Sequence, residues 1–350
     1  WLHCEQWFAP QLARIMLIDG YDAIGAIPSL LVCLGTNLMA VASVWLAMDM
    51  VRRRTTLAMA AIAALGIAIG SPMLHYATVE PSMSHIPGLF VVTAIFWVYG
   101  RYELDRGAAE HPFLWLGLGL LIGLATTVRW QLALILLPFA CQLMIRRQWR
   151  SLLFLLLGAL ALSWTVPWMW HKLYGKLLVV PANPDSPGAF LQAPGNLLNI
   201  WFSGRRGLFT WSPIVAFAVA GVITRFRDHK TLIIVTVSCF LLQSLISASV
   251  RDWWGGWAFG MRRLVELYPV YVLGLALCLD WVQSRFGSPG FRIAALLTLA
   301  AMLWCLWLML FFNMGLVHPD TGTVSEALYA LTHLSAETKK RILALIPLMH

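Results

Sequence analysis

Ten continuous apolar stretches, each about 15 to 24 residues long, set the strongest limit on how this chain folds. An α-helix needs about 20 apolar residues to cross ~30 Å of hydrocarbon, whereas the strands of a transmembrane barrel alternate polar and apolar residues. The stretches therefore predict an all-α fold, a polytopic transmembrane helix bundle with about ten spans. They cover residues 27–50, 55–73, 85–99, 113–127, 131–145, 152–170, 209–223, 231–249, 264–282 and 292–312.

The composition agrees with a membrane protein. Apolar residues make up 60% of the 350 residues and charged residues only 12%, whereas soluble domains are about 45–50% apolar and about 25% charged. These values exclude a disordered or water-soluble class and leave no room for a separate soluble domain. We expect residues 1–26 to be the remnant of a first outer loop, 27–312 to form the membrane domain and 313–350 to be an outer tail, with a short surface helix at 335–346.

The net charge of +9 predicts a topology. Basic residues concentrate in cytoplasmic loops of membrane proteins, and thirteen of them fall in five short connections on one side of the alternating helices. We therefore expect that side to face the cytoplasm and the segment 1–26 to face outward, which implies a further transmembrane helix upstream. The thirteen are Arg52, Arg53, Arg54, Arg101, Arg106, Arg146, Arg147, Arg150, Arg225, Arg227, Lys230, Arg285 and Arg292.

The first unusual outer connection is the stretch 71–85 (SPMLHYATVEPSMSH), whose one acid is Glu80. Two histidines, His75 and His85, flank it, and Tyr76 lies nearby. A carboxylate among histidines suits acid–base chemistry or a metal ligand. The alternative is a solvated loop carboxylate, with each histidine a hydrogen-bonded interfacial residue.

A second feature is Arg129, which lies between two short apolar stretches in the sequence TVRWQ. An arginine near membrane depth is costly and usually has a partner. We interpret Arg129 as a phosphate ligand. The alternative is that its long side chain reaches the interface without binding anything.

The third feature pairs two outer loops rich in glycine, arginine and tryptophan, 202–213 (FSGRRGLFTWSP) and 251–266 (RDWWGGWAFGMRRLVE). Guanidinium groups match phosphate oxygens, glycines let the backbone approach an anion, and tryptophans stack on sugars. We expect the loops to converge on one lipid phosphate, although a tryptophan also fits an interfacial aromatic belt and Glu266 an ion pair with Arg262. The proposed ligands are Arg205, Arg206, Trp254, Arg262 and Arg263.

At these residues the chain resembles bacterial polytopic glycosyltransferases of the GT-C superfamily, above all the dolichyl-phosphate-mannose mannosyltransferase-like and aminoarabinose-transferase-like branches. The resemblance extends to about residue 282. It depends on GSPM at 70–73 with the stretch 75–85, on Arg129-Trp-Gln, on GLFTWSP at 207–213 and on WWGGWAFGMRR at 253–263. In the family the residue before Gly-Leu-Phe is often histidine, and here it is Arg206.

The resemblance implies a GT-C-like fold over 27–312 and a transferase of the bacterial inner membrane whose active site faces the periplasm. Such an enzyme moves a hexose or pentose from a polyprenyl-phosphate carrier to a lipid, glycan or protein acceptor, and nucleic acid is not a partner. Glu80 and His85 are then the expected catalytic residues, and Glu80 the expected ligand if a divalent metal takes part. The other residues, expected to bind substrate, are His75, Tyr76, Arg129, Arg205, Arg206, Trp254, Arg262 and Arg263.

Two alternatives stay open at this point. One is a transporter or flippase of lipid-linked saccharides, for which ionisable residues along a path through the membrane would be typical. The other is a non-catalytic, degenerate transferase, because the acid that serves as base in the family follows the first transmembrane helix, a region without a recognisable acidic motif here. Glu5, Asp19 and Asp22 are the acids in what the sequence has of that loop.

Overall fold

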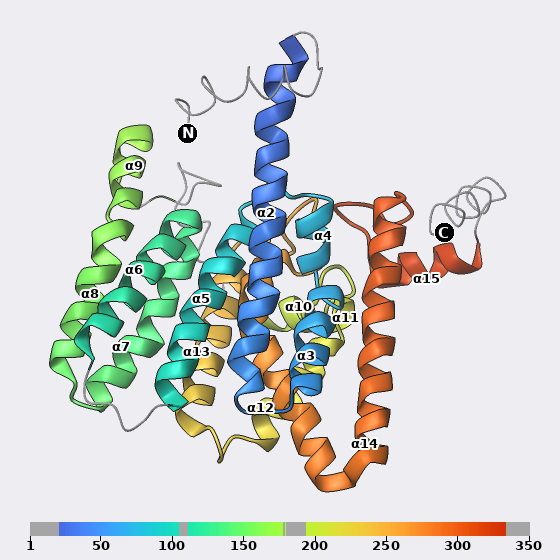
Figure 1. The fold of residues 1–350 in the computed structure, drawn as a ribbon. Coiled ribbons are helices and arrows are strands. Elements are labelled where there is room, and N and C mark those ends of the chain that lie inside the picture. The colour runs from blue at the N-terminus through green and yellow to red at the C-terminus, as the bar shows by residue number, and fades with distance from the viewer. Residues whose placement is uncertain (1–20, 105–110, 178, 180–193, 334–350) are drawn as a thin grey trace.

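The computed structural model describes residues 21–104, 111–177, 179 and 194–333, and all regular structure in this part of the chain is helical (Figure 1). The predicted all-α class is confirmed. Within the described residues four helical segments are long and apolar enough to cross a membrane, fewer than the expected ten. They are Pro28–Arg52, Trp149–Tyr174, Lys230–Ala248 and the bent Arg262–Asn313.

The expected apolar stretches nevertheless correspond closely to helices. In the first half of the chain the elements are α2 (Tyr21–Arg52), α3 (Leu57–Ile69), α4 (Met73–Thr78), α5 (His85–Leu104), α6 (Pro112–Val128), η1 (Trp130–Ile135), α7 (Leu136–Ile145), α8 (Trp149–Ser163) and α9 (Thr165–Tyr174). Several, such as α3 with 13 residues, are shorter than a membrane span, which is why the span count is lower than the stretch count. Helix α2 begins at Tyr21, and its part that is apolar enough to span a membrane runs from Pro28 to Arg52.

The second half begins, within the described residues, at a short 3₁₀ turn. Its elements are η3 (Pro194–Asn196), α10 (Leu197–Phe202), α11 (Leu208–Trp211), α12 (Ile214–Thr224), α13 (Lys230–Ala248), η4 (Arg262–Leu267), α14 (Tyr268–Asn313) and α15 (Val324–Thr332). Helix α14 reverses direction at Gly287, whose φ of 65° lies in the left-handed region that glycine adopts without strain. The two expected stretches 264–282 and 292–312 are thus the two arms of one hairpin (Figure 1).

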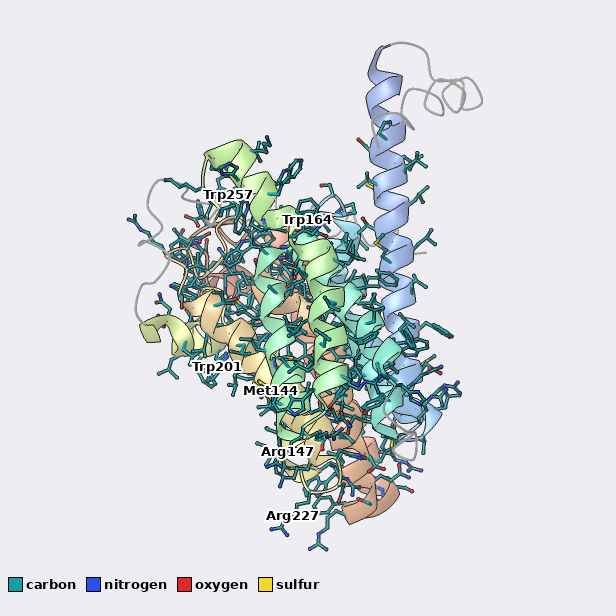
Figure 2. All side chains as sticks on the ribbon, turned by 90° about the vertical axis from the view of Figure 1, so that its left-hand side faces the viewer. Met144, Arg147, Trp164, Trp201, Arg227 and Trp257 are labelled. Carbon is teal, nitrogen blue, oxygen red and sulfur yellow. The ribbon has the colours of Figure 1, made fainter. Side chains whose placement is uncertain are left out.

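The basic connections gather at one end of the bundle, which we call the basic end. The turns between α2 and α3, between α7 and α8, between α12 and α13, and at Gly287 lie there, while α4 and α9 lie toward the opposite end (Figure 1). Figure 2 shows Arg147 and Arg227 at the basic end and Trp164 and Trp257 at the opposite one. The fifth expected basic connection lies partly in 105–110, outside the described residues. Which end faces the cytoplasm remains a sequence-based prediction.

Two close helix crossings depend on glycine. A Cβ atom on Gly119 of α6 would overlap the backbone carbonyl of Leu155 on α8, and a Cβ on Gly158 of α8 would overlap the carbonyl of Leu116. Gly221 of α12 meets Gly274 of α14 in the same way. Small residues let helix backbones approach closely, which is how helices associate in a membrane. These glycines therefore determine which helices pack as pairs.

The segment after residue 313 is part of the folded body up to the end of α15. Val324 and Ala327 are buried in a small apolar cluster with Trp211, Phe259 and Phe311. The described part of the expected tail 313–350 thus packs on the helix bundle. The surface helix expected at 335–346 lies outside the described residues.

Candidate functional site

The site is built around α4, a helix of six residues that the Ser71–Pro72 turn starts. Its end is closed by the backbone N–H groups of Val79 and Glu80, which donate to the carbonyl of His75 at 2.7 and 3.2 Å. This short helix buries His75 and Tyr76 and leaves Glu80 half-buried at its end.

The loop 251–261 packs directly on α4, so two of the sequence motifs meet. The Tyr76 hydroxyl donates to the carbonyl of Phe259 at 3.3 Å and accepts from its N–H group at 3.2 Å. The His75 ring stacks on the ring of Phe259 with centroids 4.9 Å apart. Gly260, at φ 57°, lies against Pro72, where a Cβ atom would come within 2.7 Å of the proline Cγ. A larger residue at 260 would separate the two motifs.

Beneath these residues lies a buried network of His85, Glu266 and Arg129. Glu266 Oε1 lies 2.9 Å from His85 Nδ1 and 3.1 Å from Arg129 Nε. Arg129 Nη1 lies 2.9 Å from His85 Nδ1 and 3.2 Å from Nε2. With the proton on Nδ1, His85 donates to the carboxylate, and Nε2 is the ring nitrogen that can accept from Arg129. The ring centroids of His85 and Tyr76 lie 4.6 Å apart, so the network also contacts α4. Thus Arg129 and His85 bind one carboxylate in the arrangement seen here.

The alternative considered for Arg262, an ion pair with Glu266, is not found in the structure. The two residues lie on η4, a 3₁₀ helix with three residues per turn, so positions i and i+4 point about 120° apart instead of sharing a face. Glu266 turns toward α5, where Gly88 leaves room: a Cβ atom there would lie 3.3 Å from Glu266 Cγ. This leaves the Arg262 guanidinium without a hydrogen bond or ion pair to any described residue.

Arg262 lies over the loop that precedes it and beside α4. Gly255, at φ 85°, makes room for its side chain, because a Cβ atom at 255 would lie 2.9 Å from Arg262 Nε. The positive charge of Arg262 acts on Glu80 and Tyr76, whereas His85 is influenced more strongly by Arg129. Burial raises the pKa of the Glu80 carboxyl above its ordinary value, and the guanidinium of Arg262 opposes that shift.

Three polar atoms of the cluster are buried without a partner within the described part of the chain. They are the two ring nitrogens of His75 and Oε2 of Glu80. Glu80 Oε1 lies 3.8 Å from His75 Nε2, too far for a hydrogen bond. Burial without a partner lowers the pKa of His75 to about 4, so the ring is neutral at pH 7. Unpaired buried polar groups are costly, and they concentrate where a ligand or water completes them.

Arg206 has a different position from the one expected. It is fully buried, and its guanidinium donates to the carbonyls of Gly322 at 3.0 Å and Pro319 at 2.9 Å, with a further bond to His318 at 3.4 Å. It also lies over the ring of Trp211, 4.4 Å from the centroid. Arg206 therefore binds backbone carbonyl oxygens of the loop after α14, where a phosphate was expected, and its role in this structure is to hold that loop.

Arg205, Arg263 and Trp254 are also engaged inside the protein. Arg205 Nη2 lies 3.3 Å from Asp320 Oδ1, and its guanidinium lies 3.8 Å from the ring centroid of Trp254. The Trp254 indole donates to Asp320 at 2.8 Å, and Arg263 Nη2 lies 2.8 Å from Asp252 Oδ2. Of the four arginines expected to converge on a phosphate, Arg262 is thus the one that the described residues leave unpaired.

The side chains around Glu80 do not form a set of metal ligands among the described residues. Among the described residues no group of three or more His, Cys, Asp and Glu side chains is placed to hold a metal ion. Glu80 has one histidine near it, and Glu266 is already bound to Arg129 and His85.

Sequence reasoning missed the contribution of the 318–322 loop. Asp320 and the carbonyls around it bind both arginines of the first glycine-rich loop, although more than a hundred residues separate the partners. No local pattern predicts such a contact. The one feature of the sequence that pointed to such a contact was the adjacent pair Arg205 and Arg206, since buried cations need partners.

Comparison with known proteins adds no relative: no family model matches this chain, and neither a curated protein nor a solved structure is significantly similar to it. What the fold and site define is therefore a class only. The described part of the chain is a helical bundle with four apolar helical segments of membrane-spanning length, and it contains a half-buried carboxylate near an arginine that no described residue pairs.

Proposed function

We propose that this chain is a membrane glycosyltransferase that takes a sugar from a polyprenyl-phosphate carrier and gives it to an acceptor at the outer face of a bacterial inner membrane. The observation that carries the proposal is Arg262, which no described residue pairs and whose positive charge acts on the half-buried Glu80. Oε2 of Glu80 and both ring nitrogens of the neighbouring His75 also lack partners within the described residues. A cation next to a carboxylate of raised pKa suits a reaction that expels a phosphate and removes a proton.

In the proposed reaction Arg262 holds the carrier phosphate, and Glu80 faces the acceptor hydroxyl. The acceptor oxygen bonds to the anomeric carbon as the bond from that carbon to the phosphate oxygen breaks. The electron pair leaves with the phosphate, where Arg262 stabilises the added charge, and the hydroxyl proton goes to Glu80. A single displacement of this kind inverts the anomeric centre.

The network of Arg129, Glu266 and His85 serves as support in this proposal. It fixes η4 against α5, and therefore holds Arg262 at the end of the apolar bundle. His85, expected as a catalytic residue from the resemblance, is proposed here as a positioning residue, because it lies buried below Tyr76 with both ring nitrogens bonded.

The first test measures binding of undecaprenyl phosphate to the purified full chain in lipid nanodiscs. We expect Arg262→Ala to weaken binding by about ten- to hundredfold, since a hydrogen bond to a charged group contributes about 1.5–3 kcal/mol. Arg262→Lys restores part of the affinity, because an ammonium cannot form the bidentate fork. Arg251→Ala, an exposed arginine of the same loop, is the matched control. Equal effects of the Arg251 and Arg262 variants would overturn the proposed phosphate site.

The second test concerns Glu80. We expect Glu80→Gln to leave folding and undecaprenyl phosphate binding near wild type while transfer of sugar from the carrier is lost, because the amide keeps the shape but cannot accept the proton. Retained turnover would reduce Glu80 to a solvated loop acid.

The third test is the orientation. In a cysteine-free background, Ser284→Cys at the basic end and Lys172→Cys on α9 should react with a membrane-impermeant reagent from opposite sides. Both positions are exposed, so burial does not limit labelling. Reaction of both from one side would remove the transmembrane arrangement on which the proposal depends.

A further inference from the structure

An apolar groove of about 710 Å³ opens between α7 and α13, and none of the residues that line it belongs to the candidate site. Its walls are formed mainly by Leu137, Cys141 and Ile145 of α7 and by Ile234, Leu241 and Leu242 of α13. The volume is in the range of ligand sites in proteins, and exposed apolar surface on a membrane helix faces lipid.

The groove ends in positive charge. Lys230, the first residue of α13, and Arg146, the residue directly after α7, line the groove next to the basic end. Arg146 Nη1 lies 3.1 Å from Glu103 Oε1, so its charge is largely compensated. The exposed Lys230 makes no ion pair with the described residues. Arg147, in the adjoining turn, and Arg150, at the start of α8, are also exposed (Figure 2 shows Arg147).

In the turn beside the groove, Arg147 has an unfavourable backbone conformation. Arg147 is the one described non-glycine residue with a positive φ, 56°, where the chain leaves α7. Its N–H donates to Met144 and the next N–H to Leu143, at 3.0 Å each, which is the helix ending that glycine normally provides. A positive φ at a non-glycine residue costs about 1–2 kcal/mol, and residues with such strain are often found at functional sites.

The length of the groove indicates the kind of lipid that fits. From Lys230 to Leu242 α13 rises about 18 Å, which is slightly more than half of the ~30 Å hydrocarbon layer. A chain anchored at the basic end would thus reach just past the middle of the membrane. That length suits the acyl chain of a phospholipid in one leaflet.

We propose that this groove binds an anionic phospholipid from the leaflet at the basic end, with an acyl chain between α7 and α13 and the phosphate at Lys230. The apolar walls take the chain, while the charges of Lys230, Arg147 and Arg150 complement the headgroup. The site is independent of the proposed transferase reaction, which uses residues at the opposite end.

The experiment titrates phosphatidylglycerol or phosphatidylcholine into the delipidated full chain in detergent and measures the bound fraction by native mass spectrometry. Phosphatidylglycerol should bind about tenfold tighter, and Lys230→Gln should remove about that factor by taking away one charged contact. The matched control is Arg227→Gln, which removes an exposed charge at the same end but outside the groove and should change affinity by less than about twofold.

A second arm tests the chain. Ser238→Phe fills the groove and should weaken both lipids, whereas Ala161→Phe, at an exposed position of α8, should weaken neither. Cys141→Phe, on the facing wall, replaces Ser238→Phe if that variant unfolds. Equal binding of the two lipids, equal effects of Lys230→Gln and Arg227→Gln, or undiminished binding with the groove filled would each overturn the proposal.

Discussion

The Glu266 carboxylate lies 2.9 Å from the imidazole of His85, and both side chains are almost completely buried. Arg129 approaches the same carboxylate oxygen at 3.1 Å. These contacts join η4, α5 and the start of η1 in a region where water is scarce. Because a buried charge without a partner is strongly unfavourable, the network is stable only while all its members are present.

The first prediction follows from that interdependence. Glu266→Ala should lower the free energy of unfolding by about 3–5 kcal/mol, because it leaves the partly buried Arg129 without its counter-charge. Adding Arg129→Ala should cost less than the sum of the single changes, by about 0.5–3 kcal/mol. Denaturant unfolding in detergent micelles measures both. Strictly additive effects would show that the two charges are not coupled.

The second prediction concerns pH. His75 has a pKa of about 4 in the folded protein against 6.5 for an ordinary histidine, so the folded state binds fewer protons between these values. The stability that neutral His75 contributes is complete above pH 6.5 and is lost as the pH falls toward 4, by about 3 kcal/mol in total. His75→Phe, which keeps an aromatic ring on Phe259, should remove this loss.

The neighbouring Glu80 has to be controlled in that experiment. Its raised pKa acts with the opposite sign, because the folded state then binds more protons and becomes relatively more stable as the pH falls. Glu80→Gln should therefore be present both in the reference protein and in the His75→Phe protein. If the two show the same pH dependence of unfolding, His75 is not the titrating group.

The third prediction tests the close crossing of α6 and α8. Gly119→Ala should destabilise the protein by about 1–3 kcal/mol, because the added methyl group overlaps the backbone of Leu155. Gly117→Ala, two residues away, meets no atom within 4 Å and should be neutral or slightly stabilising. Thermal unfolding of the two variants compares them directly. Equal effects would mean that helix propensity, and not contact, determines the result.

The fourth prediction separates the two arginines at 205 and 206. Arg206→Ala should cost about 3 kcal/mol or more and expose the 318–322 loop to limited proteolysis, because it leaves several buried carbonyls unpaired. Arg206→Lys should not restore stability fully, since lysine lacks the planar fork. Arg205→Ala, which removes a half-exposed ion pair, should cost about 1 kcal/mol or less. The reverse order would contradict the structural role of Arg206.

Much of the architecture could be predicted because it depends on local sequence. Apolar runs such as 231–249 become helices, here α13 (Lys230–Ala248), because in a membrane each backbone group has to be bonded within its own segment. The basic turns at one end follow from the same alternation (Figure 1). The number of spans could not be predicted, since the apolar run 55–73 contains only the 13-residue helix α3 before the chain turns at Gly70.

The sequence by itself determined the helical class and where most of the helices lie along the chain. It did not determine which arginine stays free, because that depends on distant partners: Asp320 for Arg205, the carbonyls of the 318–322 loop for Arg206, and Asp252 for Arg263. Tertiary packing also places the Glu266 carboxylate against Arg129 and His85, so that it forms no ion pair with Arg262. The strength of an ion pair depends on the distance between the charges in space, and the separation of two residues along the chain says little about that distance.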